Sequence, residues 1–256
     1  MEVASLFRIR ISDTKTFRNV LDALSAIVDE ATFTIDPDGI KLRAMDPSRV
    51  AMVDFEMRKT SFDEYESEGE SKVCVNLNEL KKLLKRAGKD DTIEMSLSED
   101  SGQFLVKIRG RYTRTFSLPV LESSEEEIPE PKLTFNAKIT LTASDFYDTL
   151  RDAEMVSDSV RIEADGERLV MSAKGDVAGA EIEIRKGDDT LISMEVKEPS
   201  KATFSLSYLT DIVKAAADTS DIVTLEFSTD MPLRLDFRQR YDGKLVYLLA
   251  PRVEVE

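Results

Sequence analysis

The chain has 256 residues, of which 41% are hydrophobic, so it can fill the core of one large domain or of two typical ones. It holds no histidine and a single cysteine, Cys74, which excludes disulfide frameworks, cysteine-based zinc sites and nucleophiles that require a histidine partner. The net charge of −15 argues against nucleic-acid binding by the surface as a whole, because phosphates are bound by protein cations. No apolar run of about 20 residues and no leader-like apolar core in 1–11 is present, so we expect a cytoplasmic protein.

In chain order, the first half mostly alternates polar and apolar residues, as half-buried strands do. This pattern predicts strands at 6–11, 31–35, 40–44, 50–57, 92–97, 104–108 and 112–118. Helical spacing predicts one helix from Asp13 or Thr14 to Ala31 and a second from Asn76 to Gly88. The segment 36–39, Asp-Pro-Asp-Gly, has the spacing of a hairpin turn and lacks the distal glutamate of a calcium loop.

Residues 119–132 contain three prolines and five glutamates and show neither the helix nor the strand periodicity. This composition is typical of a solvated connector. We therefore predict an N-terminal domain at 1–118, a connecting loop at 119–132 and a C-terminal domain at 133–256. The second half again shows two helical patterns, at 143–154 and 207–217. Its predicted strands are 159–164, 168–173, 178–185, 191–196, 222–228, 233–238 and 244–249.

The two halves read as copies of one unit. Adding 129 to a residue number takes Phe17 to Phe146, Leu77 to Leu206 and Tyr112 to Tyr241. Chance agreement between two apolar patterns is the alternative, but the agreement spans four separate segments, which favours duplication. The predicted fold class is α+β, with two duplicated domains of antiparallel sheets that carry two helices each. A pseudo-symmetric chain of this kind usually forms a larger assembly or encloses another molecule.

The sequence contains no glycine-rich motif of the kinds that cradle phosphates. Carboxylate pairs occur throughout a chain with 50 acidic residues, so no single pair indicates acid–base catalysis. We predict that the protein is not an enzyme and needs no cofactor or metal. A carboxylate metal hydrolase is kept as an alternative, which metal-dependent turnover would reveal.

The basic residues are concentrated on one predicted helix. Lys81, Lys82, Lys85 and Arg86 lie opposite its leucine face, and their spacing of four residues gathers them into a patch. A solvated helix face is the ordinary explanation. In a strongly acidic chain, however, such a patch creates a bipolar field that attracts a polyanion to one surface.

A third feature is apolar. The hydrophobic strand 245–250 is stopped by Pro251, and the loops 45–50 and 231–233 carry methionine, valine and proline. Ordinary edge packing and a docking surface for a partner both explain this composition.

Several segments, in order, are similar to a known family. They are 45–50 (Met-Asp-Pro-Ser-Arg-Val), 76–77 with 83–86, 128–130 (Ile-Pro-Glu), 156–159 (Val-Ser-Asp-Ser), 207–209 and 248–252 (Leu-Leu-Ala-Pro-Arg). Together they resemble proliferating cell nuclear antigen, the DNA sliding clamp, of the archaeal type. The resemblance implies a homotrimer of two-domain subunits, closed into a pseudo-sixfold ring with helices inside and sheets outside.

The implied function is topological. The ring would encircle duplex DNA without reading its sequence, and would act as a processivity factor by tethering DNA polymerase. Clamp loader, flap endonuclease, DNA ligase and other replication and DNA repair proteins would bind through short aromatic peptide motifs. A subunit of a heterotrimeric checkpoint-type or specialised clamp is the alternative. In an archaeon the cytoplasmic protein would be nucleoid-associated.

The resemblance also implies three sets of residues. The DNA-facing set is Lys15, Arg18, Lys81, Lys82, Lys85, Arg86, Arg151 and Lys214. The subunit interface would use Arg86, Arg111, Tyr112, Arg114, Phe116, Asp148, Asp152, Ala178, Ala180 and Ile182. The partner-peptide pocket would use Met45, Arg49, Val50, Ile128, Pro232, Tyr247, Leu249, Ala250 and Pro251. Asp148 departs from the basic residue common in the family, so we expect a weakly positive third helix whose acids pair with arginines of the neighbouring subunit.

Overall fold

The computed structural model describes residues 5–98, 101–122 and 128–253. Its chain forms two compact units. The first unit comprises residues 1–44, 54–128 and 239–244, and the second comprises 45–53, 129–238 and 245–256. Packing thus assigns two short segments, 45–53 and 239–244, to the unit of the other half of the chain, while the linear domain division stays a prediction.

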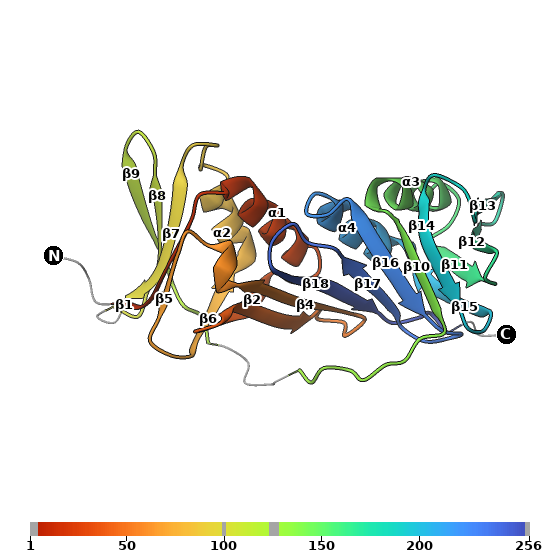
Figure 1. The fold of residues 1–256 in the computed structure, drawn as a ribbon, viewed down its shortest axis with the longest axis horizontal. Helices are drawn as coiled ribbons and strands as arrows, with labels where there is room; N and C mark the ends of the chain where they lie inside the picture. The colour runs from red at the N-terminus through yellow and green to blue at the C-terminus, as the bar shows by residue number, and fades with distance from the viewer. Residues whose placement is uncertain (1–4, 99–100, 123–127, 254–256) are drawn as a thin grey trace. The chain divides into compact units, whose positions relative to one another are not determined.

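The first unit contains an antiparallel sheet with the strand order β5-β1-β7-β8-β9 (Figure 1). Its strands are β1 (Ser5–Ile11), β5 (Glu64–Ser67), β7 (Thr92–Ser98), β8 (Phe104–Arg109) and β9 (Thr113–Leu118). The other strands of this unit belong to a different sheet, in the order β4-β3-β2-β6. They are β2 (Glu30–Asp36), β3 (Gly39–Met45), β4 (Ala51–Arg58) and β6 (Ser71–Asn76), with a short 3-10 turn, η1 (Lys59–Ser61), after β4.

Two helices, α1 (Thr14–Leu24) and α2 (Leu77–Leu84), pack side by side in the first unit (Figure 1). Both begin at the predicted caps: the Asp13 carboxylate accepts from the Thr16 amide at 3.0 Å, and the Asn76 side chain accepts from the Glu79 amide at 3.0 Å. The predicted extension of the first helix to Ala31 is wrong. The helix ends at Leu24, and the residues after it already lead into β2.

The second unit repeats this plan. Its five-stranded order is β14-β10-β16-β17-β18, and its four-stranded sheet has the order β13-β12-β11-β15. The strands are β10 (Ala137–Thr142), β11 (Ser159–Ala164), β12 (Arg168–Lys174), β13 (Gly179–Arg185), β14 (Leu191–Val196), β15 (Ser200–Ser205), β16 (Ile222–Phe227), β17 (Leu233–Phe237) and β18 (Gly243–Leu249). The helices α3 (Ala143–Glu154) and α4 (Leu206–Ala217) pack against each other.

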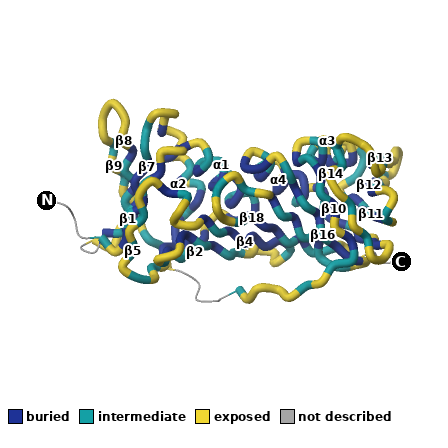
Figure 2. Tube along the Cα trace, in the orientation of Figure 1, coloured by how far each residue is buried: buried dark blue, intermediate teal, exposed yellow. Residues whose placement is uncertain are grey.

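The structure confirms the internal duplication. The starts of α1 and α3 differ by 129 residues, as do the starts of α2 and α4, and the strand orders of the two units correspond one to one. The core of each unit is filled by equivalent side chains: Phe17 and Leu21 of α1, and Phe146 and Leu150 of α3, are all at most 3% exposed. Each such burial stabilises by roughly 1.5–3 kcal/mol. Figure 2 shows buried residues along the strands and at intervals along the helices.

The turn at 36–39 is a hairpin, as predicted. Its Asp36 side chain accepts hydrogen bonds from the Asp38 and Gly39 amides at 2.8 and 3.1 Å, and it forms an ion pair with Lys41 at 2.7 Å. A Cβ atom at Gly39 would lie 2.4 Å from the Met57 carbonyl oxygen, so this position requires glycine. Among the described residues, no group of three or more acidic or cysteine side chains could hold a metal ion, and no helix is long and apolar enough to cross a membrane.

Candidate nucleic-acid and protein interfaces

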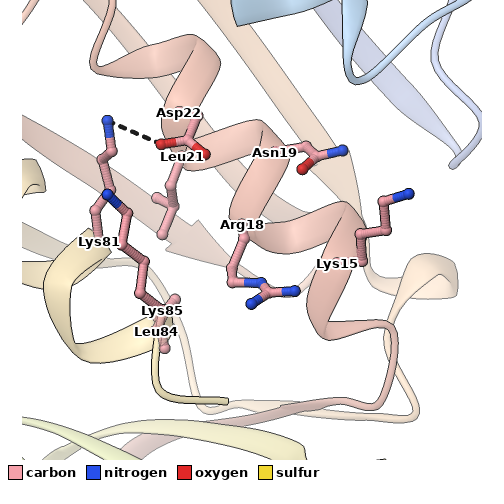
Figure 3. Close-up of a pocket in the computed structure, with 8 residues that line it drawn as sticks. All are labelled: Lys15, Arg18, Asn19, Leu21, Asp22, Lys81, Leu84 and Lys85. Carbon is pink, nitrogen blue, oxygen red and sulfur yellow. Dashed lines mark ion pairs between the residues drawn. The ribbon is translucent and has the colours of Figure 1, made fainter. Parts of the chain in front are cut away.

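The cations of α1 and α2 come together around a hollow, which we call the α1–α2 hollow (Figure 3). It has a volume of about 220 Å³. Its lining residues are Lys15, Arg18, Asn19, Leu21, Asp22, Lys81, Leu84 and Lys85. Four of the eight predicted DNA-facing residues therefore share one concave surface, where their fields add.

Two of these cations are held in place by the protein. The Arg18 guanidinium donates to the Ala87 carbonyl oxygen at 3.2 Å. Lys81 is mostly buried, pairs with Asp22 at 2.9 Å and donates to the Ser25 hydroxyl at 2.6 Å. Lys15 and Lys85 are exposed at the rim. The hollow thus combines two fixed cations with two long flexible ones, and Asp22 offsets part of their charge.

The remaining predicted DNA-facing residues are spread out. Lys82 lies outside the hollow lining and pairs with Glu79 of its own helix at 2.6 Å. Arg86 is exposed just after α2. In the second unit, Arg151 of α3 lies over the Tyr147 ring at 5.9 Å, and Lys214 of α4 is exposed. The hydrogen bond to Tyr147 raises the pKa of Arg151, and the nearby Glu154 and Asp148 carboxylates raise it further.

Both strands predicted to join subunits are sheet edges. Within the described residues, β9 pairs only with β8 and β13 pairs only with β12, so each presents one row of unpaired backbone groups. Tyr112, just before β9, is 66% exposed. Ala178 is exposed, while Phe116, Ala180 and Ile182 are partly exposed.

One predicted interface residue is already engaged within its own chain. Arg114 pairs with Asp91 at 2.5 Å, donates to the Arg86 carbonyl at 2.8 Å and lies 5.2 Å from the Tyr112 ring centre. Hydrogen bonds from the Gly88 amide and from Arg114 lower the pKa of Asp91. Arg114 is therefore better placed to orient Tyr112 than to meet Asp148 or Asp152 of a neighbour. Arg86 and Arg111 are exposed and keep that expected role.

The β13 edge carries two apolar side chains that the sequence reasoning missed. Met155, just after α3, is 83% exposed, and Val177, in the loop before β13, is 100% exposed. The loop backs onto the end of α3, since a Cβ atom at Gly175 would lie 2.0 Å from the Val156 carbonyl oxygen. The sequence signal was available, because both residues fall outside the apolar periodicity of the elements beside them.

The third candidate surface is built on the loop 45–50, in which Asp46 is the organising residue. Its carboxylate accepts from the amides of Ser48 at 3.0 Å, Val50 at 2.7 Å and Ala51 at 2.6 Å, and from the Tyr208 hydroxyl at 2.8 Å. Burial alone would raise the pKa of Asp46, but these hydrogen bonds outweigh it and leave the pKa below its ordinary value.

The segment after β18 is fastened beside this loop. The Ala250 amide donates to the Val50 carbonyl at 2.9 Å, and the Arg252 amide donates to the Thr203 carbonyl at 2.7 Å. Met45 is 36% exposed, and Val50, Pro232, Ala250 and Pro251 are partly exposed. Arg49 is exposed and has a φ of 57°, in the left-handed region. Ile128 belongs to the first unit, where its carbonyl accepts from Arg43 at 3.2 Å.

Two predicted pocket residues are wrong for a contact surface. Tyr247 and Leu249 are both 0% exposed, and Tyr247 packs edge-on against Phe237 with 6.0 Å between ring centres. Successive strand residues point to opposite faces, so the outward residue at this end of β18 is Leu248, which is partly exposed. The run 245–250 is apolar throughout, so the sequence alone did not show which of its side chains face outward.

Comparison with known proteins finds a family match in each half of the chain. Residues 6–116 match the proliferating cell nuclear antigen N-terminal domain, and residues 127–252 match the C-terminal domain of that family. The chain belongs to the proliferating cell nuclear antigen family.

Its similar relatives include archaeal proteins named DNA polymerase sliding clamp. The one from Pyrobaculum aerophilum is 40% identical over 242 residues, covering 94% of this chain and 96% of the relative. That from Pyrococcus furiosus is 37% identical over 249 residues, covering 97% and 99%. Among solved structures, proliferating cell nuclear antigen from Thermococcus kodakaraensis matches with a TM-score of 0.91 and 30% identity, over 96% of this chain and all of that one. A complex of two such antigens from Sulfolobus tokodaii matches with a TM-score of 0.88 and 30% identity over the same shares.

Proposed function

We propose that this protein is a DNA sliding clamp, a non-enzymatic ring that encircles duplex DNA and tethers DNA polymerase. The observation that carries this function is the α1–α2 hollow, which gathers four cations on a chain with a net charge of −15. The relatives of this protein from Pyrobaculum aerophilum and Pyrococcus furiosus are named DNA polymerase sliding clamp.

The chemistry of the helices suits sliding. Lysine and arginine side chains attract phosphates over a long range without reading bases, so one position along DNA is about as favourable as the next. A tethered polymerase rebinds its template as an intramolecular event, which raises processivity without new chemistry at the active site. The protein would accordingly reside with the chromosomal DNA of the cell.

The ring would be a homotrimer joined head to tail through the edges of β9 and β13. A heterologous contact of this type closes when the rotation between subunits completes a circle. Arg86, Arg111 and Tyr112 lie beside one edge, whereas the exposed Asp148 and Asp152 lie on α3, in the unit of the other edge. Opposite charges on the two contact regions support pairing between copies of one chain.

A heterotrimer is the second candidate, since the matching Sulfolobus tokodaii structure is a complex of two different antigens. Native mass spectrometry of the purified chain distinguishes the two. A stable trimer of this chain alone supports the homotrimer, and a monomer or dimer at micromolar concentration contradicts it.

Client proteins would dock on the surface formed by Met45, Val50, Leu248, Ala250 and Pro251. These clients would include DNA polymerase, clamp loader, flap endonuclease and DNA ligase. Pro232 is a further proposed member of this surface, and Ile128, which belongs to the first unit, stays an expectation from the family resemblance. A peptide with a glutamine, an aliphatic residue and two aromatics would insert its rings there, since buried aromatic anchors supply most of the energy of small interfaces. The acidic connecting loop favours peptides with basic flanks.

The proposal is tested by comparing how well the protein is retained on circular and on linear DNA. The clamp should be loaded by its cognate loader on nicked circular DNA, and its retention should be measured in high salt before and after the circle is cut. A sliding ring remains on the circle and leaves the linear product. Equal retention on both substrates would show ordinary binding and would refute the clamp function.

A further inference from the structure

The two units are copies, so the residues that line the α1–α2 hollow have counterparts in the second unit. The equal offset of the helix starts makes this correspondence unambiguous. Of the four cations around the hollow, only one has a cationic counterpart. In order, Lys15, Arg18, Lys81 and Lys85 correspond to Ser144, Tyr147, Thr210 and Lys214.

Two more helix positions change in the same direction. Asn19 corresponds to Asp148, and Lys82 corresponds to Asp211. Within their bounds, α1 and α2 together hold four cations and two carboxylates, a net charge of +2. The helices α3 and α4 hold two cations and five carboxylates, a net charge of −3.

Local geometry in the second unit agrees with this difference. Thr210, at the Lys81 position, is 6% exposed and contributes no charge. Arg151 occupies the position of Asp22, and its guanidinium is held against the Tyr147 ring with Asp148 and Glu154 nearby. The cation most available to a phosphate there is Lys214, with Asp211 and Asp218 on the same helix and its cap.

We propose that each subunit binds the phosphodiester backbone of DNA at one place, the α1–α2 hollow of the first unit, while the α3–α4 face contributes little attraction. This inference rests on the proposed clamp function and specifies its DNA contact. The pseudo-sixfold ring expected from the duplicated fold is then threefold in its electrostatics, with cationic and acidic helix pairs alternating.

The hollow is suited to transient phosphate binding. Arg18 and Lys81 are held by their contacts with Ala87 and Asp22, so little side-chain freedom is lost when a phosphate arrives. Asp22 lines the hollow itself and weakens its attraction. A clamp that must slide benefits from this compromise, because a fully cationic hollow would retain each phosphate longer.

The test compares two double variants, K15A/K85A in the first unit and R151A/K214A in the second, each of which removes two positive charges. Affinity for a duplex oligonucleotide is measured at several salt concentrations, and native mass spectrometry verifies the trimer. We expect K15A/K85A to lose about tenfold in affinity at low salt and to show a shallower salt dependence, because fewer counterions are released. R151A/K214A should lose about twofold. Equal losses, or a larger loss in the second unit, would overturn the inference.

A gain-of-function variant completes the test. S144K/Y147R places two cations of the hollow at the equivalent positions of the second unit and should raise the affinity for duplex DNA several-fold. No gain in affinity would contradict the inference that the second unit binds DNA weakly because it lacks these cations. Failure of the clamp function itself is distinguishable, because the unaltered protein would then show no dependence on circular DNA.

Discussion

Asp46 is a buried carboxylate that organises a whole loop. It accepts three backbone amides and the Tyr208 hydroxyl, so its charge is stabilised by partners from its own loop and from α4. Its lowered pKa means that it binds its proton more weakly in the folded state than in the unfolded state. The stabilisation it provides is therefore present above the unfolded pKa of about 3.9 and is lost as pH falls through the lower folded pKa.

We predict that Asp46→Ala lowers the free energy of unfolding by about 2–4 kcal/mol, because several buried donors lose their acceptor. Tyr208→Phe removes one hydrogen bond and should cost about 1 kcal/mol. Chemical unfolding at pH 7 measures both. The difference between Asp46→Ala and the unaltered protein should shrink near pH 3, and a difference that is constant with pH would contradict the role of the charge.

Neighbouring residues of β18 provide a second prediction at this scale. Leu248→Ala should weaken binding of an aromatic client peptide about tenfold and leave stability nearly unchanged, because the side chain faces outward. Tyr247→Ala should instead cost about 3–5 kcal/mol of stability through a core cavity. Isothermal titration and chemical unfolding separate the two effects. The reverse pattern would restore Tyr247 to the contact surface.

At the scale of the elements, the sequence predicted the helices, most strands and the duplication, because apolar periodicity records which faces are buried. It overextended the first helix, since Ile27 and Val28 continue the apolar spacing after the backbone has left the helix at Leu24. The candidate sites were only partly predictable. Helical spacing in the sequence indicated that the cations of α2 form a patch. The pairing of Arg114 with Asp91 could not be predicted, because it joins residues 23 apart and leaves no local pattern.

The exposed end of the β13 edge leads to a prediction about assembly. Val177→Asp places a charge on a fully exposed apolar position beside the proposed subunit contact, and should shift the trimer toward monomer at low micromolar concentration. Ile192→Asp, on the 50% exposed Ile192 of β14, is the matched control and should leave the trimer intact. Analytical ultracentrifugation measures both. Equal dissociation by the two variants would indicate a general effect of charge rather than an interface.

At the scale of the whole molecule, the proposed function depends more on closure of the ring than on affinity for DNA. The cations provide attraction that salt screens within about 10 Å, whereas a closed ring holds DNA at any salt concentration. Val177→Asp should therefore lose retention on circular DNA even though its α1–α2 hollow is unchanged. Three copies of this variant fused through flexible linkers should regain retention, because the effective concentration of covalently joined subunits offsets a weakened contact. Recovery on circular but not on linear DNA, measured by gel filtration in high salt, is the expected result; a fused trimer that still leaves the circle would show that the lesion lies in DNA contact instead of closure.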